Sequence, residues 1–373
     1  TVFRALHRGW SRDTVGGHVV RRNHIHHCEQ TGIVGHLGCI YSRITDNMIQ
    51  DIHRHKRFAG AEIAGIKLHA AIDCLIAHNR IERADRGIWL DWQAQGTRVH
   101  ANLISRCDLQ DFFIEVSHGP TVVDHNILLS EASVLNVAQG TCFAHNLLAG
   151  TVKQVGVPNR FTPYHMPHST AVSGLMTVLG GDDRWYNNLF LPGSKVQATG
   201  GPDTDSPDAD NSDFAGIDAP RVGYGTSVYD GFPVDADQWK RAKTPNDYAA
   251  LRLPVFVGNN GYGENAKPWE HESNATTGGG SVSIGSDGDA VVLTLRLDPS
   301  LAQAQATVVE TSMLGHAFES EALFEDYDAT PLRLDRDFHG KPHSGHIGPF
   351  ANLDAGEQTL IVFGSDRVGR ESD

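Results

Sequence analysis

Two carboxylates, Asp91 in GIWLDW and Glu115 in FFIEVSHGP, have the residue type and the spacing to share one reaction. They occupy equivalent positions in two consecutive copies of an internal repeat. If each copy is one coil of a solenoid, the two side chains lie side by side on one surface. A close pair of carboxyl groups is the arrangement that glycoside hydrolysis requires.

The repeat is marked by an Asn between two short hydrophobic strands. It recurs at seven positions: Asn23, Asn47, Asn79, Asn102, Asn126, Asn146 and Asn188. The first six are 20 to 32 residues apart, and the β-branched runs around them carry no helical stripe, which predicts a parallel β-helix. Asn suits the turn because its amide can bond to the next copy of itself and because it tolerates left-handed backbone.

A second strand in each repeat leads to the two carboxylates. Alternation sends one set inward: Ile66, Leu68, Ile88, Leu90, Phe112, Ile114 and Leu135. The other positions form two outward columns, namely His69, Asp91, Glu115 and Asn136, and Lys67, Trp89 and Phe113. Since adjacent strands lie about 4.8 Å apart, we expect the two carboxyls roughly 5 to 6 Å apart. That separation favours a retaining glycosidase over an inverting one, which needs about 6.5 to 9.5 Å.

The neighbours of the two carboxylates are apolar, and no Arg stands beside them in the sequence. Trp89 and Trp92 flank Asp91, and their rings could stack on the apolar faces of a sugar. Packing beneath a loop is the alternative for these two rings. Two acids on an exposed sheet face are the alternative for the carboxylates.

The chain closely resembles the family-120 glycoside hydrolases, which include β-xylosidases, in six motifs: GAEIAGIKLHAA, GIWLDW, GTR, FFIEVSHGP, RFTPYHMPHS and LGGDDRWYNN. These motifs lie between about residues 20 and 190, and GYGTSVYDGFP resembles the same family further on. The resemblance implies a right-handed parallel β-helix. It also implies a retaining, exo-acting enzyme that removes xylose from the non-reducing end of xylo-oligosaccharides.

The resemblance separates the roles of the acidic residues. Asp91 resembles the family nucleophile, Glu115 the acid/base, and Glu62 of GAEIAGIK a third carboxylate near the sugar. The alternative for Glu62 is a loop acid at a strand entrance. Lys67 and His69 lie one coil before Asp91, where they could hold it ionised, bind a hydroxyl group or instead pair with Glu62.

The composition of the chain limits the classes of ligand that it is expected to bind. The 373 residues carry a net charge of -14, and no basic stripe accompanies the aromatics, so a small oligosaccharide is expected rather than nucleic acid. No apolar run reaches the roughly 20 residues of a membrane span. The five Cys residues form no CxxC pair and are expected to be reduced and buried, which favours a cytoplasmic location.

Metal ions and cofactors are not expected. HIHHC at 24–28 and HRHK at 53–56 are rich in His, but neither has HExxH or a matched Cys set, so solvated positions are favoured. Five Asp residues between 203 and 213 lack the Gly and the terminal Glu of an EF-hand loop, which favours a solvated loop.

Three regions are predicted along the chain. Residues 1–192 carry the coils and the candidate site, 193–254 form a loop-rich insertion, and 255–373 form a last coil and a β-rich C-terminal cap. Alternating runs after residue 274, among them AVVLTLRL, ATVVETS and TLIVF, predict antiparallel strands that either cap the coils or pack along them. Full-length members of the family that this chain resembles are longer. We therefore expect a missing N-terminal segment or a second copy of the chain to complete the site.

Two other functions stay open at this point. A β-helix polysaccharide lyase would need Ca²⁺ or several Arg and Lys residues to neutralise a uronate, whereas the column offers Lys67 and His69. A carbohydrate-binding solenoid without catalysis would bind sugar and turn nothing over.

Overall fold

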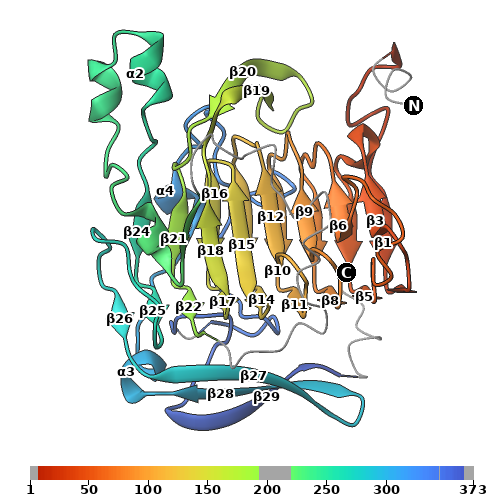
Figure 1. Cartoon of the computed structure of the whole chain (residues 1–373), viewed down its shortest axis with the longest axis vertical. Helices are drawn as coiled ribbons and strands as arrows, with labels where there is room; N and C mark the ends of the chain where they lie inside the picture. The colour runs from red at the N-terminus through yellow and green to blue at the C-terminus, as the bar shows by residue number, and fades with distance from the viewer. Residues whose placement is uncertain (1–6, 193–219, 344, 365–373) are drawn as a thin grey trace.

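The computed structural model describes residues 7–192, 220–343 and 345–364. As predicted, these residues form a right-handed parallel β-helix, in which three long sheets run along the solenoid axis (Figure 1). The first sheet contains β1 (Val19–Arg21), β4 (Arg43–Thr45), β7 (Leu75–Ala77), β10 (Thr97–His100), β13 (Thr121–Asp124), β16 (Thr141–Ala144), β21 (Arg184–Tyr186) and β24 (Phe256–Gly258).

The second and third sheets complete each coil. The second contains β2 (His24–His26), β5 (Met48–Gln50), β8 (Arg80–Glu82), β11 (Leu103–Ser105), β14 (Ile127–Leu128), β17 (Leu147–Leu148), β22 (Leu189–Phe190), β25 (Gly261–Tyr262) and β26 (Thr276–Thr277). The third contains β3 (Thr31–Gly35), β6 (Ala64–Leu68), β9 (Ile88–Leu90), β12 (Phe112–Glu115), β15 (Ala132–Val137), β18 (Thr151–Gln154) and β23 (Arg221–Gly223). All neighbours pair in parallel except β18 and β23.

A ladder of Asn side chains runs through the corner between the first and second sheets. Each amide donates to the side-chain oxygen of the next at 2.9 or 3.0 Å, through Asn23, Asn47, Asn79, Asn102, Asn126, Asn146, Asn188 and Asn260. The predicted repeat is therefore confirmed, and Asn260 extends it to the coil expected at 254–262. The left-handed turn residue is not the Asn but its predecessor, as at His78 with a φ of 56°.

Loss of one rung should weaken the whole fold. Asn102→Ala removes the acceptor of two Asn79 donors and the donor to the carbonyl of Ile76, all of them buried. Each buried group left without a partner costs about 1–3 kcal/mol, so we expect the free energy of unfolding to fall by at least about 2 kcal/mol. Urea unfolding of this variant measures the loss of stability, and Asn246→Ala, the same change at an exposed side chain, is the control. Equal midpoints for both variants would refute the role of the ladder.

The inward and outward faces of the third sheet follow the predicted alternation over three coils. The predicted inward residues Ile66, Leu68, Ile88, Leu90, Phe112 and Ile114 all lie in one buried core cluster. The next coil is shifted by one residue, because Phe113 pairs with Leu135 and Ile114 pairs with Asn136. The prediction for Leu135 and Asn136 was therefore wrong. The inward Asn136 is tolerated because its amide donates to the buried carboxyl of Asp183 at 2.9 Å.

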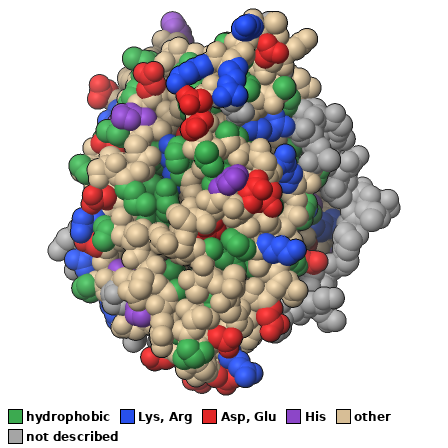
Figure 2. Space-filling model, turned by 90° about the vertical axis from the view of Figure 1, so that its left-hand side faces the viewer, with side chains coloured by type: hydrophobic (Ala, Val, Ile, Leu, Met, Phe, Trp, Pro, Cys, Tyr) green, Lys and Arg blue, Asp and Glu red, His purple; other side chains and the backbone are tan. Residues whose placement is uncertain are grey.

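The C-terminal strands form a separate antiparallel sheet of β27 (Gly280–Asp287), β28 (Ala290–Leu297) and β29 (Gly356–Phe363). This sheet packs along the second sheet, where Leu293 shares an apolar cluster with Leu103 and Ile127 (Figure 1). The strand predicted for the run ATVVETS is wrong, because no strand forms there and a short helix begins at Thr311. On the face shown in Figure 2, basic and acidic side chains are interspersed.

The remaining elements are short. They are η1 (Leu37–Cys39), the hairpin strands β19 (Val157–His165) and β20 (Val172–Val178), η2 (Thr226–Tyr229), η3 (Asp237–Arg241), α2 (Pro245–Ala249), α3 (Pro299–Ala302) and α4 (Thr311–Leu314). Within the described residues, no helix has the length and apolar character needed to cross a membrane. Four of the five cysteines are buried, as predicted, and Cys28 is half-buried. The Asp-rich segment at 203–213 lies outside the described residues.

Candidate active site

Asp91 and Glu115 lie at the same ends of two neighbouring strands in the third sheet. Asp91 directly follows β9, Glu115 ends β12, and the register pairs Leu90 with Ile114 just before them. Both side chains emerge on the outer face of the sheet, yet the two residues are only 5% and 7% exposed. The strand pairing thus brings the predicted pair together in a buried setting.

Asp91 has a cation beside one oxygen and an N–H donor on the other, and Nδ1 of His69 also lies 3.2 Å from its Oδ2. The ammonium of Lys67 lies 3.0 Å from its Oδ2, and the backbone N–H of Trp92 donates to its Oδ1 at 2.7 Å. Lys67 is fully buried, lies 3.3 Å from Glu62 and donates to the carbonyl of Ala61. A cation and an N–H donor on its two oxygens suit Asp91 to act as a carboxylate.

Glu62, His69 and Trp92 form one hydrogen-bonded chain beside Asp91. The indole N–H of Trp92 donates to Nδ1 of His69 at 2.7 Å, so Nδ1 carries the lone pair. The N–H of His69 is then at Nε2, from which it donates to Glu62 at 2.9 Å. The Glu62 side chain is 37% exposed, but its Oε2 is buried beside Lys67.

Glu115 has a different environment. The indole N–H of Trp89 donates to its Oε2 at 3.1 Å, and Arg160 forms an ion pair with its Oε1 at 3.0 Å. Burial, the neighbouring charge of Asp91 and a hydrogen bond with Asp91 raise the pKa of Glu115 to about 7, against the lowering effect of Arg160. A carboxyl with this pKa can hold and release a proton near neutral pH.

Trp89 lies beneath the carboxylates and does not face outward to a sugar. Its ring has the Lys67 ammonium 3.2 Å from the centroid and is stacked against Phe113 at 5.0 Å. The predicted stacking of a sugar on Trp89 does not fit these contacts, because its ring is covered. Its indole N–H instead positions Glu115. Trp92 is half-buried and stays available at the edge of the site.

Arg160 is the residue of this site that the sequence reasoning missed. It belongs to the β19–β20 hairpin, whose register joins Val157 to Val178. Two contacts tie the hairpin to the turns after β9 and β12: His118 to Thr162 at 2.9 Å, and Gln95 to His165 at 2.9 Å. The motif RFTPYHMPHS begins at Arg160, but strand columns do not place a hairpin side chain.

Comparisons with known proteins add one match. No protein-family model and no curated protein matches the chain. A solved structure described as the complex structure of XylC with xylose matches with a TM-score of 0.84 and 37% sequence identity. The match covers 97% of this chain and 54% of XylC, so the chain spans about half the length of that protein.

Proposed function

We propose that this chain is a retaining, exo-acting β-xylosidase in which Asp91 is the nucleophile and Glu115 the acid/base. The observation that carries the proposal is the contrast between two adjacent buried carboxyls. Asp91 has a cation and an N–H donor on its oxygens, whereas the pKa of Glu115 is raised to about 7. Two carboxyls in such different environments divide into a nucleophile and an acid. The xylose in the XylC complex supports a xyloside as the substrate.

The reaction would proceed in two displacements. Glu115 protonates the glycosidic oxygen while an Asp91 oxygen attacks the anomeric carbon, which breaks the glycosidic bond and leaves a xylosyl ester on Asp91. Glu115, now ionised, takes a proton from water as that water attacks the same carbon. The ester bond breaks, Asp91 returns as a carboxylate, and xylose leaves with its original anomeric configuration.

The neighbours of the pair would bind and orient the sugar. The Glu62 side chain is 37% exposed, and because its Oε2 is buried beside Lys67, we propose that Oε1, which also contacts His69, meets a sugar hydroxyl. Half-buried Trp92 donates to the other nitrogen of His69. Lys67 is enclosed by Asp91, Glu62 and Trp89. We therefore propose that it balances the negative charge of Asp91 and Glu62 and does not contact the substrate.

An aryl-glycoside screen of the whole chain tests the proposed function. We expect faster release of the aryl group from the β-xyloside than from the arabinoside or the galactoside. Binding of xylo-oligosaccharides without any turnover would favour a non-catalytic solenoid. An unsaturated product, lost on chelation of Ca²⁺, would favour a lyase.

Arg160 should set the alkaline side of the pH profile. The acid step needs protonated Glu115, so activity is present below the pKa of Glu115, about 7, and falls as the pH rises through it. Arg160 lowers this pKa, so Arg160→Met should raise it and move the alkaline limb of kcat/KM to higher pH. Arg241→Met, at an exposed residue of η3, is the matched control. An unmoved or acid-shifted limb would contradict the role of Arg160.

A further inference from the structure

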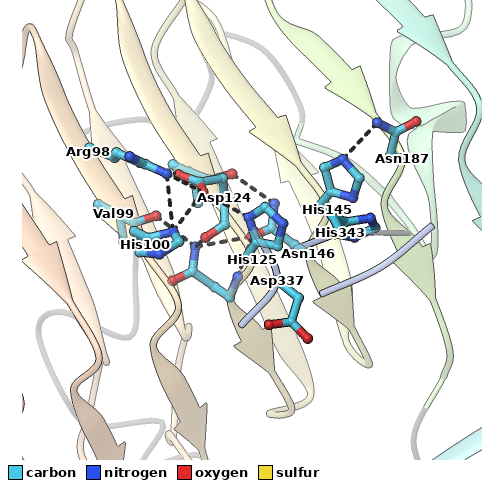
Figure 3. Close-up of polar contacts among 12 residues, drawn as sticks. Arg98, Val99, His100, Asp124, His125, His145, Asn146, Asn187, Asp337 and His343 are labelled. Carbon is cyan, nitrogen blue, oxygen red and sulfur yellow. Dashed lines mark hydrogen bonds and ion pairs between the residues drawn. The ribbon is translucent and has the colours of Figure 1, made fainter. Parts of the chain in front are cut away.

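Three histidines converge in a part of the molecule that the proposed reaction does not use. His125 and His145 stand at equivalent corners of consecutive coils, each directly before an Asn of the ladder, and His343 comes from the C-terminal segment (Figure 3). One ring nitrogen of each lies within 4.8 Å of the other two. These corners follow β13 and β16 of the first sheet, whereas Asp91 and Glu115 follow strands of the third sheet.

His125 presents a free lone pair to the centre of this cluster. Its Nδ1 donates to the carboxylate of Asp124 at 2.9 Å, which places the lone pair on Nε2. That Nε2 is buried and has no hydrogen-bond partner among the described residues. A carboxylate behind a His with an unused second nitrogen is the arrangement that orients metal-bound histidines.

Asp124 is well suited to the orienting role. It is paired with Arg98 at 2.8 Å and with His100 at 2.7 Å (Figure 3). His100, Asp124 and His125 also approach one another closely enough for a metal site. Arg98 already occupies both oxygens of Asp124, so we assign this group to support and not to binding.

The other two rings have hydrogen-bond partners of their own. The ring of His145 stacks on that of His125 with centroids 4.8 Å apart, and its Nε2 accepts from the amide of Asn187 at 3.0 Å. Nδ1 of His145 and Nε2 of His343 approach the same carbonyl oxygen, that of Gly348, at 3.2 and 3.4 Å. The backbone N–H of Gly345 also donates to Nδ1 of His343 at 3.3 Å. A bound ion would replace the two contacts to Gly348, and His145 and His343 would each have to change tautomer or turn over to offer it a lone pair.

We propose that His125, His145 and His343 bind one divalent transition-metal ion, with Zn²⁺ as the best fit. Imidazole nitrogens are preferred ligands of Zn²⁺, and an oxygen, from the Gly348 carbonyl or from water, would complete a tetrahedral set. Zn–N bonds of about 2.0–2.1 Å would draw the three nitrogens together by an ångström or so.

The bound ion would join distant parts of the chain. His343 lies between α4 and β29, so the ion would fasten the C-terminal segment to two consecutive coils. This role is independent of the proposed xylosidase activity. The His-rich run at 24–28 is an unrelated surface feature, where the exposed rings of His26 and His27 contact each other at 2.8 Å.

Metal titration of the whole chain tests the proposal. After dialysis against chelator, we expect one equivalent of Zn²⁺ to bind, Co²⁺ to give the visible absorption of a tetrahedral site, and Tm to rise by about 3 °C or more at saturation. His343→Gln should weaken binding by more than about 10-fold and remove the rise in Tm. His346→Gln, a neighbour outside the cluster, should behave as the wild type.

Two results would overturn the proposal. One is the absence of saturable Zn²⁺ binding at one equivalent. The other is binding that survives in His343→Gln and disappears in His26→Gln, which would place the ion on the surface run. Because His343 is half-buried, its variant is expected to fold, and an unchanged Tm without metal verifies this.

Discussion

Asp91→Asn is expected to lower kcat/KM for an aryl β-xyloside by on the order of 10⁴-fold or more, as loss of an attacking group does elsewhere. The amide keeps an oxygen that can accept the backbone N–H of Trp92, so the local fold should persist. It has no charge to offer Lys67 and no anionic oxygen to attack the anomeric carbon. Initial rates of aryl release measure the loss.

The control for this variant is Glu131→Gln, the same change of carboxyl to amide at an exposed position beside the third sheet. It should keep near-normal rates, and both variants should share the wild-type Tm within a few degrees. Near-normal turnover by Asp91→Asn would show that another group attacks the sugar.

Glu115→Ala is expected to slow the reaction by an amount that depends on the leaving group. A poor leaving group such as the second sugar of xylobiose needs a proton, so its rate should fall by about 10²–10⁴-fold. A dinitrophenyl group leaves without one, so xylosylation should stay fast and the second step should become limiting. A burst of dinitrophenolate followed by slow turnover is the expected signature.

Azide separates an acid/base role from simple disruption. Azide needs no general base, so it should attack the xylosyl ester in Glu115→Ala, speed turnover and give a xylosyl azide with retained configuration. The wild type should gain nothing, because water already reacts with base assistance. Equal losses of rate on both leaving groups, without rescue by azide, would show that Glu115 takes no part in proton transfer.

The regular part of the fold was predictable because it depends on local patterns. The Asn repeat marks one corner of each coil, and period-2 alternation assigned Ile88 and Leu90 to the core. The prediction failed at Asn136, where a polar residue turns inward to meet Asp183 and Tyr229. Those partners come from later coils, and no pattern near residue 136 reveals them.

The candidate site was predictable only in part for similar reasons. Column positions bring Asp91, Glu115 and Lys67 together, since strand register is a repeat property. They do not show that Lys67 covers the Trp89 ring, which depends on how long side chains fold over one another. Nor do they place Arg160, because a hairpin carries it back over the sheet. The His125 cluster was missed because its third ring, His343, comes from the far C-terminal segment of the chain.

The covalent intermediate offers the most direct test of the central claim. In a 2-fluoro β-xyloside the fluorine slows both steps, but a good leaving group keeps the first step fast. The xylosyl ester should therefore accumulate and be seen by mass spectrometry of the intact chain. After digestion at low pH, we predict the fluoroxylosyl mass on the peptide that contains Asp91. A label on another residue, or product release with inverted configuration and no adduct, would contradict the account.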